Sequence, residues 1–330
     1  MEETLMSAAV SADSILREMT DLWVTLGAPG KAETGMGVLR ACSMTLIVVT
    51  EEGEDPAALG ETIAALMPVH PARAIILRLE GGPGRQLAAK VVAQCWMPFG
   101  QRRQICAEQI EITASETLWE DAVSTAAAIA APDLPIIVWW RSQRADFGVL
   151  GGLATKVVVD SARGRDDKRA LGQLAEAMRG GIRLADLSWT RLTLWRQMLA
   201  QVFENRHHLE QLASISKVTV AFGGERPPAS AWYMGAWLAN ALADTASSVS
   251  LEMKPDASGV VGQLMRVELE GASLRTELSR RDGRLVIAVG TLTQCTSLPT
   301  ANDYQAMHEE LGIVRQDAVF ERALTTAVRG

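Results

Sequence analysis

The chain has 330 residues, of which 48% are hydrophobic and 22% charged, as expected for a folded globular protein of about two domains. Its net charge of −7 and its lack of Lys/Arg runs argue against nucleic acid as a partner. The longest apolar stretches, such as Ile136–Trp140, are far shorter than a membrane span, and Glu2 and Glu3 stand where a secretory signal needs basic residues. We therefore expect a cytoplasmic protein with neither a membrane nor a nucleic-acid partner.

Helices and strands alternate in the first half of the sequence. Apolar spacing and turn residues predict strands at 44–49, 74–79, 91–97, 105–112, 135–140 and 156–160, and helices at 5–26, 56–67 and from Ser115 or Glu116 to Pro132. Asp55 is the expected cap of the second helix. The last two strands are short and β-branched, which is typical of a buried parallel sheet, and a helical segment separates them. This half is predicted to be an α/β domain with a mostly parallel sheet.

The second half has a different pattern. We expect a long helix at 187–204, a strand at 217–222, a helix at 229–243, four strands at 248–253, 263–270, 273–279 and 284–290, and final helices at 303–311 and 317–328. Alternating polar and apolar residues in the four strands predict an antiparallel sheet with one solvent-exposed face. His207 and His208 are expected at the end of the long helix, where a cation interacts favourably with the helix dipole.

The predicted fold class is therefore α/β, in three parts. Residues 1–35 form an N-terminal helix and a linker, and residues 36–165 form the α/β domain. Residues 181–330 form an α+β domain with an antiparallel sheet. The boundary is placed between residues 163 and 180, where the charged segment 163–169 is expected to be exposed.

Two segments combine Trp and Arg at close spacing. They contain Trp139, Trp140 and Arg141 in the first segment and Asp186, Trp189, Arg191, Trp195 and Arg196 in the second. Exposed Trp and unpaired buried Arg are both unfavourable, and the two types are enriched at protein-binding hot spots. The alternative is an amphipathic helix that buries Trp and exposes Arg, and core packing is the commoner role of any single Trp. For the whole set we favour recognition, because alternating Trp and Arg fills a core poorly.

Asp160 and Ser161 directly follow a predicted parallel strand. Open α/β sheets bind ligands at this edge, but such a pair also makes a good helix cap, and the sequence does not decide between the two. The candidate partner-binding residues are Trp139, Trp140, Arg141, Asp160, Ser161, Asp186, Trp189, Arg191, Trp195 and Arg196.

Common catalytic motifs are missing from the sequence. It has no GxGxxG after a strand, no GxxxxGK[ST], no GxSxG and no HExxH, so dinucleotide, P-loop, hydrolase and zincin chemistry lose their usual support. The segment 27–31 comes closest to a phosphate loop, but it follows a helix and lacks Ser or Thr, so we interpret it as a linker. We predict a protein that is not an enzyme, without catalytic residues, cofactor or metal.

The four cysteines are Cys42, Cys95, Cys106 and Cys295. They form neither a dense disulfide framework nor a CxxC motif, and with the four histidines they do not match zinc-site spacings. Cys95 and Cys106 fall on neighbouring predicted strands where they could meet. We favour separate, reduced and mostly buried thiols.

Three strings carry a family resemblance. PDLPIIVWWR (132–141), VVVDS (157–161) and ADLSWTRLTLWR (185–196), in that order, resemble the OpcA family of glucose-6-phosphate dehydrogenase assembly proteins. Supporting strings are RAC (40–42), LIVV (46–49), HPAR (70–73), CAEQI (106–110) and AWLA (236–239), so the resemblance runs from about residue 36 to 240. The family more often has Pro where Leu194 stands, which leaves helix and turn geometry open at that point.

The resemblance implies a non-catalytic partner that binds glucose-6-phosphate dehydrogenase and assembles or allosterically activates it. Such a protein supports the oxidative pentose phosphate pathway and NADPH supply in bacteria. Cyanobacterial relatives are associated with redox control through C-terminal cysteines, whereas this chain has only Cys295 there. We therefore expect activation to be insensitive to reductant.

Two alternatives stay open. The chain is a small phosphorylated-ligand-binding regulatory protein if Asp160, Ser161, Arg141 and Arg191 form an anion site, because arginine matches phosphate geometry. Calorimetry with glucose 6-phosphate and NADP tests that alternative. The other is an enzyme with a scattered site, which activity without any dehydrogenase would reveal.

Overall fold

The computed structural model describes residues 5–6, 10–27, 38–81, 86–97, 104–142, 146–164, 167–245, 248–299 and 302–329. The chain forms two compact units: unit 1 contains Met1–Val159 and Ile182–Leu184, and unit 2 contains Asp160–Gly181 and Ala185–Gly330. The linker interpretation of 27–31 falls, beyond Gly27, outside the described residues. No helix among the described residues is long and apolar enough to cross a lipid bilayer.

The sheet of unit 1 is mostly parallel, as the sequence predicts. Its strands are β1 (Leu5–Met6), β2 (Val38–Arg40), β3 (Met44–Glu51), β4 (Ala72–Glu80), β5 (Leu87–Trp96), β6 (Gln104–Ser115), β7 (Ile136–Trp140), β8 (Lys156–Val159) and β9 (Leu184–Asp186). They follow the order β1-β5-β6-β4-β3-β7-β8-β9, with β2 beside β6. β3 runs parallel to β4 and β7, while β5 runs antiparallel to β6. The long apolar runs of β3 and β4 are buried because helices cover both faces of this sheet.

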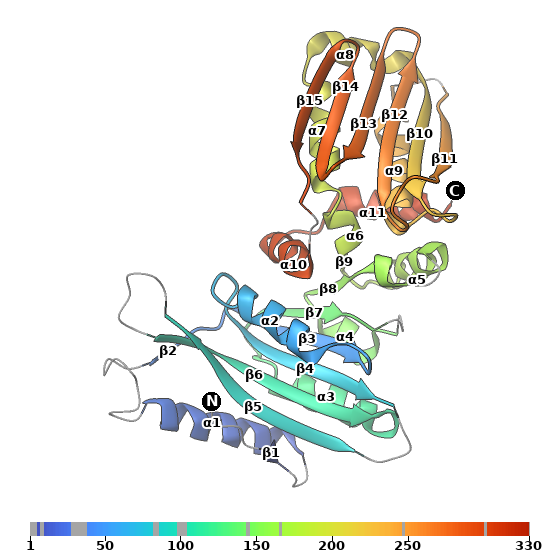
Figure 1. Ribbon diagram of the computed structural model, residues 1–330. Helices are drawn as coiled ribbons and strands as arrows, with labels where there is room; N and C mark the ends of the chain where they lie inside the picture. The colour runs from blue at the N-terminus through green and yellow to red at the C-terminus, as the bar shows by residue number, and fades with distance from the viewer. Residues whose placement is uncertain are drawn as a thin grey trace. The chain divides into compact units, whose positions relative to one another are not determined.

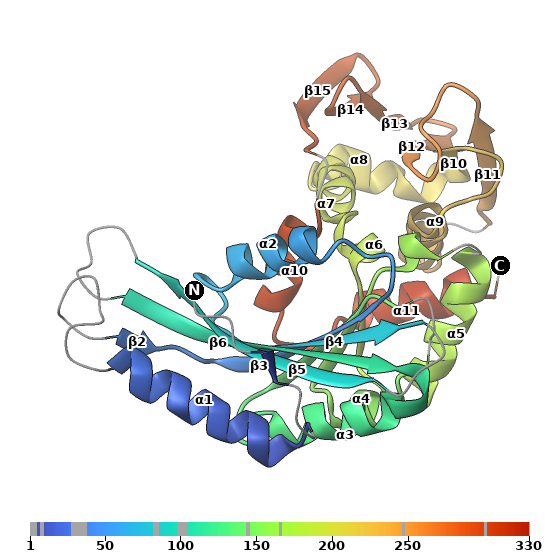
Figure 2. The same cartoon turned by 60° about the horizontal axis from the view of Figure 1, so that its bottom comes forward.

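The helices of unit 1 are α1 (Ala12–Gly27), α2 (Pro56–Leu66), α3 (Trp119–Ile129) and α4 (Gly148–Leu153). Figure 2 shows α1, α3 and α4 on one face of the sheet and α2 on the other. As predicted, Asp55 caps α2 by accepting a hydrogen bond from the Ala57 amide at 2.9 Å. The α/β character of this part of the chain is thus confirmed.

Cys95 and Cys106 form a disulfide, so the prediction of separate thiols is wrong for this pair. The two residues stand directly opposite each other in the antiparallel pair β5 and β6. Opposed side chains point to the same face of a sheet at close range, which lets the sulfurs bond. Cys42 and Cys295 are free.

Unit 2 contains a six-stranded sheet. Its strands are β10 (Ile215–Gly223), β11 (Ser250–Asp256), β12 (Leu264–Gly271), β13 (Arg275–Arg281), β14 (Arg284–Val289) and β15 (Leu292–Ser297), in the order β11-β10-β12-β13-β14-β15. The pairs from β10 through β15 are antiparallel, but β11 runs parallel to β10. A helix connects β10 to β11, and such a crossover returns the chain in the same direction. The sheet is therefore mixed rather than purely antiparallel.

The helices of unit 2 are α5 (Asp167–Arg179), α6 (Leu187–Thr190), α7 (Thr193–Val202), α8 (Arg206–Gln211), α9 (Ala229–Leu242), α10 (Asp303–Gly312) and α11 (Ala318–Ala327). In Figure 1, α7 and α9 lie on one face of the six-stranded sheet, and both contact it. The segment in which the sequence analysis places a boundary contains α5, whose residues Leu171, Leu174 and Ala175 are buried at helical spacing.

The long helix predicted at 187–204 is instead two helices, α6 and α7, separated at Arg191 and Leu192. The Thr193 hydroxyl donates to the Thr190 carbonyl at 2.8 Å across this break. Leu194 consequently lies in the first turn of α7. A proline is tolerated there because an N–H in the first turn has no helical acceptor, which accounts for the residue that the family more often has.

His207 and His208 do not end the long helix, contrary to the prediction. They lie in the first turn of the separate helix α8, which Asn205 caps by accepting from the His207 amide at 2.9 Å. Asn205 favours a new helix start at this point because its side chain satisfies the backbone donor of His207.

Candidate functional site

Asp160 and Ser161 begin unit 2, directly after β8. Asp160 caps the 3-10 helix Ser161–Arg163, accepting from the Ala162 amide at 3.3 Å. It also accepts from the Ser188 hydroxyl at 3.2 Å. The Asp160 side chain is only 6% exposed, so most of its hydrogen-bonding capacity is used inside the unit.

Arg191 pairs with Asp160 through both terminal nitrogens, at 2.8 and 2.9 Å. The turn between α6 and α7 carries Arg191 and thereby directs it back toward Asp160. One of the two nitrogens also donates to Asp303 at 3.2 Å, and Arg163 lies 3.7 Å from the other Asp303 oxygen. Arg163, Arg191 and Asp303 are partly exposed, and we call these three residues the ionic edge.

Asp186 lies fully buried at the start of α6. Its Oδ1 accepts from the amides of Ser161 and Ser188, at 3.1 and 2.9 Å, and its Oδ2 accepts from the Tyr233 hydroxyl at 2.7 Å. The carboxylate therefore joins three segments that are distant in sequence. The residues just after β8, the start of α6 and the middle of α9 are held at one point.

Burial raises the pKa of Asp186 to about 6, and the neighbouring charge of Asp160 adds to the rise. Hydrogen bonds from Ser161 and Tyr233 oppose it. Burial and the Asp186 carboxylate raise the pKa of Tyr233 well above its usual value. Asp186 thus titrates at a higher pH than an exposed aspartate because its charged form is desolvated.

Trp189 is the centre of a buried aromatic cluster. Its ring centroid lies 5.9 Å from that of Tyr233 and 6.0 Å from that of Phe320, and its indole N–H donates to Asp317 at 2.9 Å. The Arg196 guanidinium covers the Trp189 ring, 3.5 Å from its centroid. Burial lowers the pKa of Arg196 to about 10, so the side chain stays protonated at neutral pH.

Asp317 connects this cluster to α11. The other oxygen of its carboxylate accepts from the amides of Val319 and Phe320, at 2.9 and 3.0 Å, and so caps the helix. Thr190 makes a similar link to α10 by donating to Glu310 at 2.9 Å. The four-residue helix α6 is therefore fixed by hydrogen bonds to both C-terminal helices.

The first Trp/Arg segment lies in unit 1. Arg141 donates to Glu54 at 2.7 Å and covers the Trp139 ring at 4.4 Å, and its side chain is only 7% exposed. Trp140 packs edge-to-face against Phe147, with ring centroids 5.1 Å apart. This segment therefore stabilises the carboxyl end of β7.

The predicted candidates thus divide between the units. The structure places Trp139, Trp140 and Arg141 in unit 1 and Asp160, Ser161, Asp186, Trp189, Arg191, Trp195 and Arg196 in unit 2. The four tryptophans, Ser161 and Asp186 are buried, whereas Arg191 and Arg196 are partly exposed. Both Arg141 and Arg191 are paired with carboxylates, which leaves them less available as anion contacts.

Sequence reasoning missed Tyr233, Asp303, Glu310, Asp317 and Phe320 as members of this network. For Asp303 and Asp317 a signal existed, because both stand at predicted helix starts. For Tyr233 the only signal was that tyrosine is rare in this chain, which has two. The described residues contain no group of three or more His, Cys, Asp or Glu side chains arranged to hold a metal ion.

Two family models match the sequence. One, described as the N-terminal domain of the glucose-6-phosphate dehydrogenase subunit, matches residues 63–176. The other, described as the C-terminal domain of the same subunit, matches residues 182–324. The chain belongs to the OpcA family. The resemblance seen in the sequence is thereby confirmed, and it extends beyond residue 240.

Two cyanobacterial relatives carry the name OxPP cycle protein OpcA. The protein from Nostoc punctiforme is 27% identical over 180 residues, which cover 52% of this chain and 38% of the relative. The protein from Synechocystis sp. is 27% identical over 201 residues, covering 59% and 41%. The matches thus span about two fifths of the relatives' length.

Among solved structures, biliverdin reductase from Synechocystis sp. is similar, with a TM-score of 0.45 and 10% identity over 86% of this chain and 97% of that one. An oxidoreductase from Magnetospirillum magnetotacticum has a TM-score of 0.44 and 14% identity over 88% and 99%.

Proposed function

We propose that this chain is a non-catalytic partner of glucose-6-phosphate dehydrogenase. It binds the enzyme, favours its active assembly or conformation, and so supports the oxidative pentose phosphate pathway and its NADPH supply. The observation that carries the proposal is the match of both family models. Each model is described as a domain of the glucose-6-phosphate dehydrogenase subunit.

The use of polar groups in unit 2 supports a non-catalytic role. A nucleophile or general acid needs a side chain that can reach substrate. Here Asp186 accepts hydrogen bonds from the Ser188 amide and the Tyr233 hydroxyl. Asp160 accepts from the Ser188 hydroxyl and is paired with Arg191. The arrangement positions helices rather than presenting a reactive group.

We further propose that the partner is contacted at the ionic edge and at Arg196, while the buried candidates hold these residues in place. Arg191 is held by Asp160 and Arg196 lies over the Trp189 ring, and both side chains stay partly exposed. Arginine at an interface pairs well with carboxylates of a partner. A rigid frame lowers the entropic cost of that contact.

The deciding experiment adds the purified chain to the host's glucose-6-phosphate dehydrogenase and follows NADPH formation across glucose 6-phosphate concentrations. We expect copurification and a changed rate or substrate response, with no NADPH formed by the chain alone. A kinetic effect requires tighter binding to the active state of the enzyme. Superimposable kinetic curves together with separate elution would refute the proposal.

A further inference from the structure

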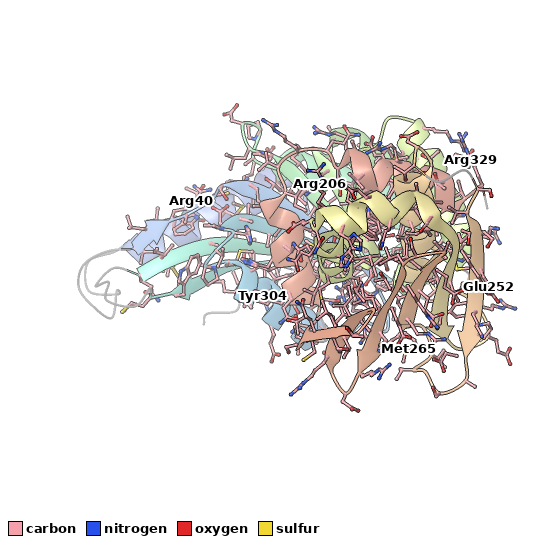
Figure 3. The ribbon with its side chains drawn as sticks, turned by 90° about the horizontal axis from the view of Figure 1, so that it is seen from above. Arg40, Arg206, Glu252, Met265, Tyr304 and Arg329 are labelled. Carbon is pink, nitrogen blue, oxygen red and sulfur yellow. A yellow bond between two sulfur atoms is a disulfide. The ribbon has the colours of Figure 1, made fainter. Side chains whose placement is uncertain are left out.

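A hollow of about 460 Å³ opens in unit 2 among residues of α5, α9 and α11 and the chain beside α11. Three arginines line it: Arg179 at the end of α5, Arg322 within α11 and Arg329 just beyond α11. Figure 3 labels Arg329, whose side chain projects from this end of the chain. The volume falls in the range of small-molecule sites, about 300–1,000 Å³.

The three arginines differ from those of the Trp/Arg segments in their partners. Arg141 and Arg191 are held by carboxylates, whereas no ion pair involves Arg179, Arg322 or Arg329 among the described residues. Arg179 and Arg322 each donate from Nε to the carbonyl one turn earlier, both at 3.3 Å. That bond orients each guanidinium and leaves its terminal nitrogens as donors.

α11 presents the hollow with a polar stripe. Arg322 and Thr326 are four residues apart on one face of α11, with Thr325 beside them, and Arg329 follows in the turn just beyond the helix. The opposite face is buried through Phe320 and Leu324. The stripe is therefore fixed in direction by the packing of α11 in the core.

One neutral side-chain amide adds to these charges. Thr326 donates to Asn240 Oδ1 at 2.8 Å, which leaves the Asn240 amide nitrogen free to donate. Glu321 is the one carboxylate in the described lining, and it accepts from Gln316. Three positive charges against one negative charge give the hollow a clear preference for anions.

We propose that this hollow binds a small phosphorylated compound. Arginine forks match the geometry of phosphate oxygens, and the amide nitrogen of Asn240 adds a neutral donor. The residues differ from those of the proposed partner surface. Ligand binding here is therefore measured on the chain alone, without the dehydrogenase.

Isothermal titration calorimetry on the isolated full chain tests the proposal, with inorganic pyrophosphate as the probe and glucose 6-phosphate and ADP as organic phosphates. We expect saturable binding of at least one of the three. Arg322→Gln and Arg329→Gln should each weaken it about tenfold or more, since each removes a charge-assisted hydrogen bond. Glu321→Gln should tighten it, because it removes the opposing charge.

Arg206→Gln is the matched control. It removes the same charge from α8, where the side chain is 92% exposed and outside the hollow, and it should leave affinity unchanged. The proposal is overturned if none of the three phosphates binds, or if Arg206→Gln weakens binding as much as Arg322→Gln does. Because no dehydrogenase is present, either result leaves the proposed partnership untouched.

Discussion

Arg191 and Asp160 form a two-pronged ion pair between the turn after α6 and the residue that follows β8, with N–O distances of 2.8 and 2.9 Å. The Arg191 side chain is 25% exposed and that of Asp160 is 6% exposed. The pair therefore lies at the rim of the core, where removal of the cation leaves a largely buried carboxylate without its main partner.

Arg191→Ala should lower the free energy of unfolding by about 2–3 kcal/mol, because Asp160 then stays buried and unpaired. Urea denaturation and the melting temperature measure this loss. Arg206, which is 92% exposed and pairs with the exposed Glu210 on α8, gives the control: Arg206→Ala should change stability by no more than about 0.5 kcal/mol. An unchanged melting temperature with a roughly thirtyfold loss of dehydrogenase affinity would instead identify Arg191 as a pure interface anchor.

Arg163→Ala tests the proposed contact surface separately from the fold. The Arg163 side chain is 36% exposed and lies 3.7 Å from Asp303, and a surface ion pair is worth no more than about 1 kcal/mol, so stability should change little. Affinity for glucose-6-phosphate dehydrogenase should fall about tenfold if the ionic edge meets the enzyme. Surface plasmon resonance with Arg206→Ala as control gives the comparison. Equal affinities of both variants would place the contact elsewhere.

Asp186→Asn should reveal the raised pKa of this buried carboxyl. The folded protein binds the proton with a pKa of about 6, against 3.8 for an ordinary aspartate, so the stabilisation from Asp186 is complete below pH 3.8 and is lost as pH rises through 6. Asparagine keeps both amide acceptor bonds and does not titrate. The free energy of unfolding of the variant, relative to that of the native chain, should therefore rise by on the order of 3 kcal/mol from about pH 4 to pH 7.

Urea unfolding of both proteins across this pH range gives the difference directly, since the other carboxyls titrate alike in each. Parallel stability curves would mean that Asp186 titrates normally despite its burial.

Asp317→Ala should lower the free energy of unfolding by more than the loss of a helix cap alone does. It removes the cap of α11 and also leaves the buried Trp189 indole N–H without its acceptor. A cap is worth about 1 kcal/mol and an unsatisfied buried donor about 1–3 kcal/mol, so the total is about 3 kcal/mol. Asp55→Ala, which removes only the cap of α2, is the matched control. Equal losses in the two variants would show that the indole bond contributes nothing.

Cys95→Ser should lower stability by about 2–3 kcal/mol, because the disulfide with Cys106 closes a loop in the unfolded chain. A reductant should lower the melting temperature of the native chain but not that of the variant. Cys42→Ser, at a free thiol, should keep the response to reductant. A native melting temperature that does not respond to reductant would contradict a stabilising bond.

Local pattern was enough to predict most elements of both units. The apolar run at 44–49 became β3, and the alternating segments from residue 263 to 290 became β12, β13 and β14, because period and burial are linked. The sequence pattern did not predict β15. Its residues are mostly exposed at the sheet edge, so no apolar alternation marks it.

The candidate site was predicted in its residues but not in its connections. The sequence marked Asp160, Asp186 and Arg191 as candidates but did not decide how they pair. The chain breaks between α6 and α7 at Arg191, whose guanidinium pairs with Asp160, while Asp186 accepts from Tyr233. A helical period could not reveal that interruption.

The sequence by itself determined the family, the order of the elements and which positions are apolar, since these depend on residues near one another in the chain. Only the tertiary structure decided the pairing of Cys95 with Cys106, of Arg191 with Asp160 and of Trp189 with Asp317. The physical reason is that strand register and helix packing, which bring distant segments within hydrogen-bonding range, are set by the whole core rather than by local spacing.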